Sequence, residues 1–364
     1  GLARLGGLSV VEEATAICLP GETCQCRPVG KSCRRAAKCC SKLCERETCV
    51  CRDIGESCQK NAHCCAGASC RSGTCAPFLP ATQYVFDGEW GSFGSDKGQF
   101  DHPRRVALDA SGRVFVTDGF NDRVQKFTSN GGFVNAWGKP GSGNGEFNNP
   151  FGIAVDGAGR VFVVDTSNHR VQKFSSNGDF LDAWGDVGDN EGEFFDPFGV
   201  AVDGAGRVYV TDGDNHRIQV FSGDGDFLDT WGKFGAGNGE FDLPVGVAVH
   251  GAKVYVADSL NDRIQQFTTD GAFVKDWGGQ GSGTGKFHVP YDVAVDKAGF
   301  VYVADAGNNR IQKFNANGVP LDNWGTFGSG NGELNLPTGL TVDAAGRVYV
   351  ADSQNHRIQV FKHK

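Results

Sequence analysis

Methionine is absent from this 364-residue chain, and so is any apolar run long enough to cross a membrane. A transmembrane helix needs about 18 or more consecutive apolar residues, so the sequence predicts no membrane span. The chain begins at Gly1, which favours removal of a signal peptide, with a scar left by expression as the alternative. Both points bear on where the protein resides.

Cysteine is absent from residues 76–364, because all 14 cysteines lie between Cys18 and Cys75. An even, dense cluster in one segment is typical of disulfides, which form in an oxidising compartment. Zinc is the alternative, but most of these cysteines stand in adjacent pairs or at long spacings, and the only nearby histidine is His63. We therefore expect a secreted protein, extracellular or at the cell surface.

Positive charge is scarce in the larger part of the chain. Residues 1–80 hold 11 Lys and Arg against 7 Asp and Glu, a net charge of +4, whereas residues 81–364 hold 24 against 36, a net charge of −12. An acidic surface repels phosphate backbones, so we expect no nucleic-acid partner.

Glycine, in contrast, is abundant at 54 residues, and tryptophan recurs at regular steps. Each tryptophan precedes a glycine, and the steps between them are 47, 47, 47, 46 and 47 residues. The six tryptophans are Trp90, Trp137, Trp184, Trp231, Trp277 and Trp324. An aspartate and an arginine follow the same period from Asp118 and Arg123 onward, so the chain contains six copies of one unit.

One unit contains four short apolar runs separated by turn residues. The predicted strands span residues 199–203, 207–212, 217–221 and 227–231. Four such strands make one antiparallel sheet, and radial repetition of sheets is the all-β arrangement that leaves only short, protected edges.

The repeated pattern, read as GVAVD, RVYVTD, then RIQVF after an Asn or His turn, resembles the NHL repeat. This resemblance implies an all-β, six-bladed β-propeller over residues 84–364. The segment Phe86–Trp90 has the pattern of a fourth strand only, and the chain ends after a third strand at Ile358–Phe361. We therefore expect the N-terminal segment to complete the last blade and close the ring.

The cysteine segment contains two successive six-cysteine patterns, each with one adjacent pair, beginning at Cys26 and Cys51. Both resemble the inhibitor cystine knot, or knottin. That resemblance implies the pairs Cys26–Cys40, Cys33–Cys44, Cys39–Cys49, Cys51–Cys65, Cys58–Cys70 and Cys64–Cys75, with Cys18 and Cys24 left to pair with each other. We expect an arm over residues 1–25, knottin-like modules over 26–50 and 51–76, a linker over 77–83 and the propeller over 84–364. The modules are expected to act as spacers, with a toxin-like or inhibitory role as the alternative.

Candidate binding residues are those that vary within the constant repeat. The position after each repeat proline begins the innermost strand near the channel mouth, and the turns between second and third strands share its face. These candidates are Arg104, Phe151, Phe198, Val245, Tyr291 and Thr338 at the mouth, with Phe120, Asp214 and Leu260 in the turns. Aromatic residues and arginine are enriched in binding surfaces. The alternative is that the aromatic residues only plug the channel.

Catalysis finds little support in the sequence. The repeated Asp and Arg occur in six copies, so we interpret them as structural hydrogen-bonding groups, and the same holds for His169, His216 and His356 at one turn position. Some six-bladed propeller enzymes hold a metal in the channel, but the mouth positions offer no histidine or carboxylate, and His102 and His288 alone do not supply three ligands. We expect no cofactor and no metal, and we interpret the Gly-rich acidic loops as flexible loops, with calcium binding as the alternative.

The sequence therefore favours a non-catalytic binding or scaffold protein whose partner is a protein, possibly a second copy of itself. Leu8, Val10 and Val11 form a short β-prone run in the arm, and the basic arm complements the acidic propeller, which predicts an oligomer or filament. Alternatives are a glycan-binding surface protein that uses the mouth aromatics and a propeller hydrolase or lyase with a channel metal.

Overall fold

The computed structural model describes residues 24–25, 44–45, 48–49, 68–71, 74–77 and 83–364. The chain divides into two compact units, Gly1–Pro80 and Ala81–Lys364. No helix in these described ranges is long and apolar enough to span a membrane.

The described residues of the N-terminal unit form five short strands. They are β1 (Cys24–Gln25), β2 (Cys44–Glu45), β3 (Thr48–Cys49), β4 (Ala68–Arg71) and β5 (Thr74–Pro77). Strand β3 pairs with both β1 and β2, and β4 forms a hairpin with β5. Every predicted disulfide includes at least one cysteine outside the described residues. The predicted arm residues Leu8, Val10 and Val11 also lie outside them, so the knottin folds and the arm stay predictions.

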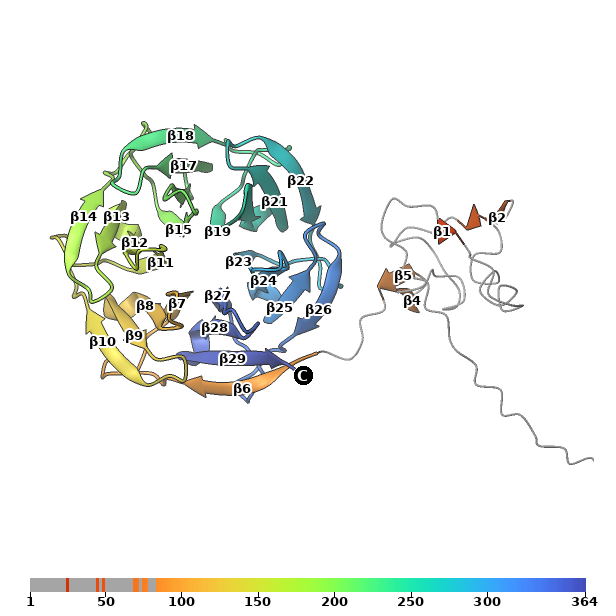
Figure 1. Ribbon diagram of the computed structural model, residues 1–364, viewed down its shortest axis with the longest axis horizontal. Coiled ribbons are helices and arrows are strands. Elements are labelled where there is room, and N and C mark those ends of the chain that lie inside the picture. The colour runs from red at the N-terminus through yellow and green to blue at the C-terminus, as the bar shows by residue number, and fades with distance from the viewer. Residues whose placement is uncertain (1–23, 26–43, 46–47, 50–67, 72–73, 78–82) are drawn as a thin grey trace, which may run out of the picture. The chain divides into compact units, whose positions relative to one another are not determined.

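The C-terminal unit is a ring of six four-stranded antiparallel sheets, as the repeat predicts (Figure 1). We number these blades one to six from the blade that contains β7. The innermost strands are β7 (Pro103–Leu108), β11 (Pro150–Val155), β15 (Pro197–Val202), β19 (Pro244–His250), β23 (Pro290–Val295) and β27 (Pro337–Val342). The second strands are β8 (Val114–Asp118), β12 (Val161–Asp165), β16 (Val208–Asp212), β20 (Lys253–Asp258), β24 (Val301–Asp305) and β28 (Val348–Asp352).

The outer half of each blade follows a tight turn. The third strands are β9 (Arg123–Phe127), β13 (Arg170–Phe174), β17 (Arg217–Phe221), β21 (Arg263–Thr268), β25 (Arg310–Phe314) and β29 (Arg357–His363). The outermost strands are β10 (Phe133–Trp137), β14 (Phe180–Trp184), β18 (Phe227–Trp231), β22 (Phe273–Gly278), β26 (Pro320–Trp324) and β6 (Tyr84–Trp90). Short 3₁₀ helices occupy the turn before the third strand in five blades: η2 (Gly119–Asn121), η3 (Thr166–Asn168), η4 (Ser259–Asn261), η5 (Ala306–Asn308) and η6 (Ser353–Asn355).

The hydrophobic core lies between neighbouring blades. Side chains alternate along a strand, so Phe162 and Val164 of β12 face blade three while Val161 and Val163 face blade one. The second strands therefore have apolar residues at successive positions, and all their residues except Lys253 of β20 are buried. A single blade cannot bury both faces, which is why the ring must be complete.

Ring closure follows the predicted arrangement. Strand β6 pairs antiparallel with β29, from Trp90 opposite Ile358 to Tyr84 opposite His363, so the first strand of the propeller completes its last blade. At the entry of β6, the Tyr84 ring stacks on Trp324 with centroids 4.3 Å apart. In the other blade junctions each tryptophan packs instead against a turn glycine of the next blade, such as Gly131 on Trp90.

Candidate functional site

The six positions predicted at the channel mouth do lie together, but they differ in exposure. Phe151, Val245 and Thr338 are buried and fill the mouth. Arg104, Phe198 and Tyr291 are half-buried. Only this second group remains accessible to a ligand, so the first three are better described as part of the channel filling.

Arg104 is held between aromatic rings. Its guanidinium lies 4.8 Å from the centroid of Phe120 and 5.5 Å from that of Phe151, and Phe151 meets Phe198 edge-to-face at 5.3 Å. Burial lowers the pKa of Arg104, whereas Tyr291 and Asp101 raise it. The channel mouth thus presents one positively charged side chain, Arg104, flanked by aromatic rings.

A buried ion pair crosses the channel below the mouth, and the sequence analysis did not identify it. Arg105 of blade one pairs with Asp292 of blade five and donates hydrogen bonds to the carbonyl oxygens of Val245, at 3.2 Å, and Tyr291, at 2.8 Å. The other Asp292 oxygen accepts the Leu340 N–H at 2.8 Å. Burial lowers the pKa of Arg105 to about 9, which leaves it charged at pH 7.

Glycine occupies the same position in the other four blades. These residues are Gly152, Gly199, Gly246 and Gly339. A Cβ atom at Gly152 would collide with the Phe198 carbonyl, and one at Gly199 with the Val245 carbonyl. The innermost strands therefore approach closely, and only two of six positions carry side chains, which meet as the ion pair. Aligning the six repeats would have exposed Arg105 and Asp292 as the two departures from glycine.

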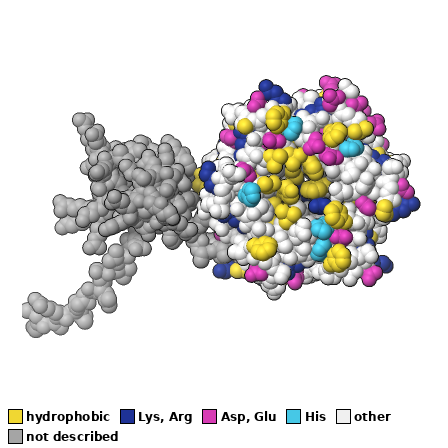
Figure 2. All heavy atoms as spheres, turned by 180° about the vertical axis from the view of Figure 1, so that it is seen from behind, with side chains coloured by type: hydrophobic (Ala, Val, Ile, Leu, Met, Phe, Trp, Pro, Cys, Tyr) yellow, Lys and Arg dark blue, Asp and Glu magenta, His cyan; other side chains and the backbone are white. Residues whose placement is uncertain are grey.

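A ring of exposed apolar side chains surrounds the mouth on the same face (Figure 2). This face carries the loops that enter the innermost strands and the turns before the third strands. Seven of these side chains are 44–71% exposed. We call them the crown: Phe93, Phe120, Val187, Phe195, Phe234, Leu260 and Phe327. Phe120 and Leu260 were predicted here, whereas the entry-loop residues were missed because their loops looked merely flexible.

Histidine rings support several crown residues. His356 lies 4.9 Å from Phe93, His216 4.9 Å from Phe234, and His102 4.6 Å from Phe120, measured between ring centroids. Figure 2 shows hydrophobic side chains filling the centre of the face, with others around it and histidines beside them. Exposed apolar rings of this extent are uncommon on a surface that contacts only water.

Asp214, also predicted on this face, lies in the turn between β16 and β17. Burial raises its pKa, and the nearby Asp196 carboxylate adds to the effect. Its backbone N–H is bound to the Phe195 carbonyl at 3.1 Å. The side chain thus places an acidic group beside the crown.

The repeated Asp and Arg serve the fold, as interpreted from their six copies. In blade three, Asp212 accepts hydrogen bonds from Arg217 Nε at 2.7 Å and Gln219 Nε2 at 3.1 Å, while its other oxygen accepts the Phe195 N–H at 2.8 Å. Burial raises the pKa of Asp212 above its ordinary value, although the hydrogen bonds from Phe195 and Arg217 oppose this shift. The network fixes the loop that enters the blade.

The polar residue that immediately precedes each third strand also has one structural role. In each junction its side chain accepts a backbone N–H from the loop that enters the next blade, for example Asp122 from Asn149 at 2.8 Å and Asn309 from Leu336 at 2.9 Å. Histidine does the same through Nδ1, as in His169 with Asp196 and His216 with Leu243, both at 3.2 Å. Both partners adopt a left-handed backbone conformation throughout.

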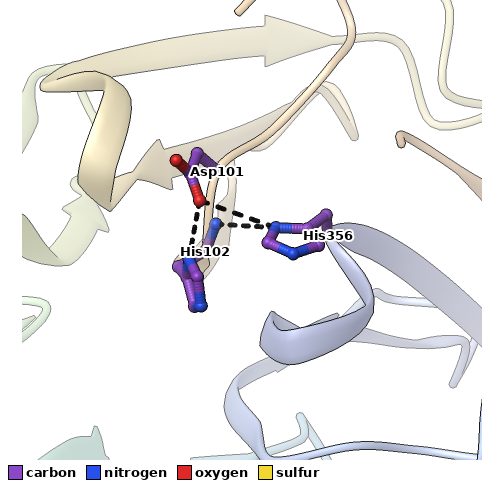
Figure 3. A group of neighbouring side chains, drawn as sticks. All are labelled: Asp101, His102 and His356. Carbon is purple, nitrogen blue, oxygen red and sulfur yellow. Dashed lines mark hydrogen bonds and ion pairs between the residues drawn. The ribbon is translucent and has the colours of Figure 1, made fainter. Parts of the chain in front are cut away.

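At the junction of the two propeller ends this position belongs to a cluster that the sequence analysis did not foresee. Asp101 and His102 lie before β7 and meet His356 from the turn before β29 (Figure 3). His102 Nδ1 is 2.6 Å from Asp101 Oδ1, and His356 Nδ1 is 3.7 Å from the same oxygen. The sequence suggested His102 and His288 but no third ligand, because His356 stands 254 residues from His102.

Comparison with protein families identifies the repeat. The NHL repeat pattern matches residues 147–174, 196–221, 287–314 and 334–361, in blades two, three, five and six. The propeller contains NHL repeats. Blades one and four of this NHL propeller keep the same strands and the same Asp–Arg pairs, although blade one carries Arg105 for glycine and blade four is one residue shorter.

Solved structures share the fold of the NHL propeller at low identity. A streptogramin B lyase has a TM-score of 0.53 at 13% identity, covering 78% of this chain and 100% of that chain. A protein of unknown function from Bacteroides thetaiotaomicron has 0.58 at 16%, covering 87% and 84%. A gluconolactonase from Xanthomonas campestris has 0.56 at 14%, covering 79% and 98%. Comparison with curated protein sequences gives no match.

Proposed function

We propose that the chain is a secreted, non-catalytic binding and scaffold protein whose crown face docks a protein partner. The observation that carries this proposal is the crown itself, seven exposed apolar side chains arranged around a partly charged mouth. Aromatic anchors close to an arginine are the composition that concentrates binding free energy in protein interfaces.

The partner that we propose is a second copy of this chain, bound through its residues 1–80. Those residues carry a net charge of +4 and the propeller segment −12, so the two parts of different copies attract each other. The run at Leu8, Val10 and Val11 supplies apolar side chains for the crown. A head-to-tail contact of this kind is heterologous and gives a closed ring or an open filament.

A binding role is favoured over catalysis by the content of the channel. The channel-lining charges of Arg105 and Asp292 neutralise each other, and Asp292 also holds the Leu340 N–H. The lyase and the lactonase share this chain's fold at 13–14% identity, which carries no activity across. Glycan binding at the mouth is also less favoured. Of the three aromatic residues that could stack on a sugar ring, Phe151 is buried, so only Phe198 and Tyr291 are accessible.

Sedimentation velocity of the full chain at low salt tests the proposal. The crown variant combines Phe93→Ser, Phe234→Ser and Phe327→Ser. Its matched control combines Val134→Ser, Leu181→Ser and Leu228→Ser, which are also exposed, 46–51%, but lie on the outermost strands β10, β14 and β18. We expect assembly by the parent and the control, and monomers from the crown variant and from a chain lacking residues 1–17.

Added salt should weaken the assembly, because exposed charge pairs are screened. Monomers of the parent at high concentration and low salt would overturn self-assembly. Equal loss in the crown variant and the control would overturn the assignment of the crown as the docking face.

A further inference from the structure

We call the junction between blade six and blade one the seam of the ring. It brings together three residues of metal-binding types from opposite ends of the propeller. Asp101, His102 and His356 each offer one ligand atom, these atoms all lie within 4.8 Å of one another, and all three residues are half-buried (Figure 3). The Phe93 and Phe120 rings pack against His356 and His102 respectively, so the group lies between two crown residues.

The seam differs from the five other blade junctions. The corresponding trios are Asn148, Asn149 and Asp122; Phe195, Asp196 and His169; Asp242, Leu243 and His216; His288, Val289 and Asp262; and Asn335, Leu336 and Asn309. Each of them contains at most two His or Asp side chains. The backbone geometry is the same at every junction, so the seam has the same frame with three ligand side chains added.

We propose that Asp101, His102 and His356 bind one divalent transition-metal ion at the seam, with zinc as the best match. Imidazole nitrogen and carboxylate oxygen are the ligands that zinc takes at about 2.0–2.2 Å. Neighbouring ligands of a tetrahedral zinc ion are therefore about 3.3 Å apart. The present separations, 2.6 Å from Asp101 to His102 and 3.7 Å from Asp101 to His356, lie on either side of that value.

Coordination requires a rearrangement at each of the three side chains. His102 binds as a neutral ring through Nδ1, with its proton on Nε2, and Asp101 turns its oxygen from His102 toward the ion. His356 Nδ1 exchanges its contact with the His102 N–H, 3.2 Å long, for the metal–nitrogen bond. A fourth ligand would be water or a group from a partner.

The bound ion ties two segments at the closure of the ring. Asp101 and His102 follow β6, the strand that completes blade six, and His356 immediately precedes β29, with which β6 pairs. Opening the ring would separate these ligands, so the ion binds the closed ring more tightly than the open one and stabilises it. This inference is independent of the docking role proposed for the crown.

Zinc titration of the oxidised full chain, followed by calorimetry and thermal unfolding, tests the site. The variants Asp101→Asn, His102→Asn and His356→Asn copy Asn148, Asn149 and Asn309 of other junctions, so each should fold. His169→Asn is the matched control, because it makes the same change at a junction with only two potential ligands. Zinc binding elsewhere in the chain is common to all variants.

We expect zinc to raise the unfolding midpoint of the parent and of His169→Asn by several degrees, with reversal by a chelator. Each seam variant should bind zinc at the propeller at least about tenfold more weakly and lose that shift. With cobalt as a spectroscopic probe, the seam site should give absorption bands of nitrogen and oxygen ligation that the seam variants lack. The same zinc response in parent and seam variants, or none in the parent at about millimolar zinc, would overturn the site.

Discussion

Asp203 shows how one side chain fixes the turn between the first and second strands of a blade. Its Oδ1 accepts the backbone N–H groups of Ala205 and Arg207, both at 2.9 Å, and its Oδ2 accepts Arg207 Nε at 2.8 Å. Burial alone would raise the pKa of Asp203, but these hydrogen bonds lower it below the ordinary value of 3.8. The charged form is therefore favoured by folding.

The sign of the pH dependence follows from this lowered pKa. The stabilisation by Asp203 is complete above the unfolded pKa and is lost as pH falls through the folded pKa. We expect Asp203→Asn to cost about 1 kcal/mol in free energy of unfolding at pH 7. Urea unfolding of parent and variant from pH 6 to pH 3 should show the difference narrowing below pH 4. A pH-independent difference would contradict this, and Asp270→Asn, which removes an 86%-exposed carboxylate 3.6 Å from the same Arg207, controls for the loss of a surface charge beside that arginine.

Val289 has a left-handed backbone conformation, which suits a β-branched residue poorly. Its φ is 50°, and the same position holds Asn149 in blade two at φ 53°. Asparagine tolerates this region better than valine by roughly 1 kcal/mol. We expect Val289→Asn to raise the free energy of unfolding by about that amount, and Asn149→Val to lower it, both measured by chemical denaturation. A loss of stability from Val289→Asn would show that side-chain packing outweighs the backbone preference.

At the scale of elements, β6 carries the closure of the ring. A chain beginning at Asp96 loses β6 and the Tyr84–Trp324 stack, so the outer edge of β29 becomes unpaired. We expect this chain to aggregate, because an unpaired strand edge is a template for other chains. A chain beginning at Ala81 keeps β6 and should stay monomeric and folded.

Light scattering and thermal unfolding of the two truncated chains provide the measurement. Equal melting of both, with both monomeric, would refute the closing role of β6. A point variant refines the test: Tyr84→Ala removes a ring that stacks on Trp324 and an OH that lies 2.9 Å from Tyr302 Oη, and should cost about 3 kcal/mol.

The strands of each blade were predictable because tryptophan, aspartate and arginine mark their ends. In blade three the third and fourth strands match the predicted Arg217–Phe221 and Phe227–Trp231. The first strand was predicted to end at Asp203, but it ends at Val202 because the Asp203 side chain caps the turn. Residues next to one another in the chain determine where each strand lies, so the sequence predicts the strands of a blade.

Contacts between blades were less predictable. The burial of Phe151, Val245 and Thr338 depends on how closely the innermost strands approach, which the ring of glycines sets. The Asp101–His102–His356 group depends on ring closure bringing two distant turns together. Neither feature has a local signal, although the closure itself was predicted.

For the whole molecule, the confinement of cysteine to residues 18–75 separates two responses to reduction. The propeller contains no cysteine, so a reducing agent should leave its near-UV circular dichroism and its unfolding midpoint unchanged. The segment 18–75 should instead become sensitive to protease, because small modules depend on their disulfides. Mass mapping that finds free thiols in the oxidised protein would contradict the predicted pairs.

The six similar blades give the crown face an approximate sixfold rotation axis. A partner that recognised only repeated features would have six equivalent azimuths, a degeneracy worth about 1 kcal/mol of orientational entropy at room temperature. Arg104 removes this degeneracy, because the mouth positions of the five other blades are Phe151, Phe198, Val245, Tyr291 and Thr338, all uncharged. An acidic group on a docking partner would select one azimuth, and successive copies stacked in that way would share a single helical pitch.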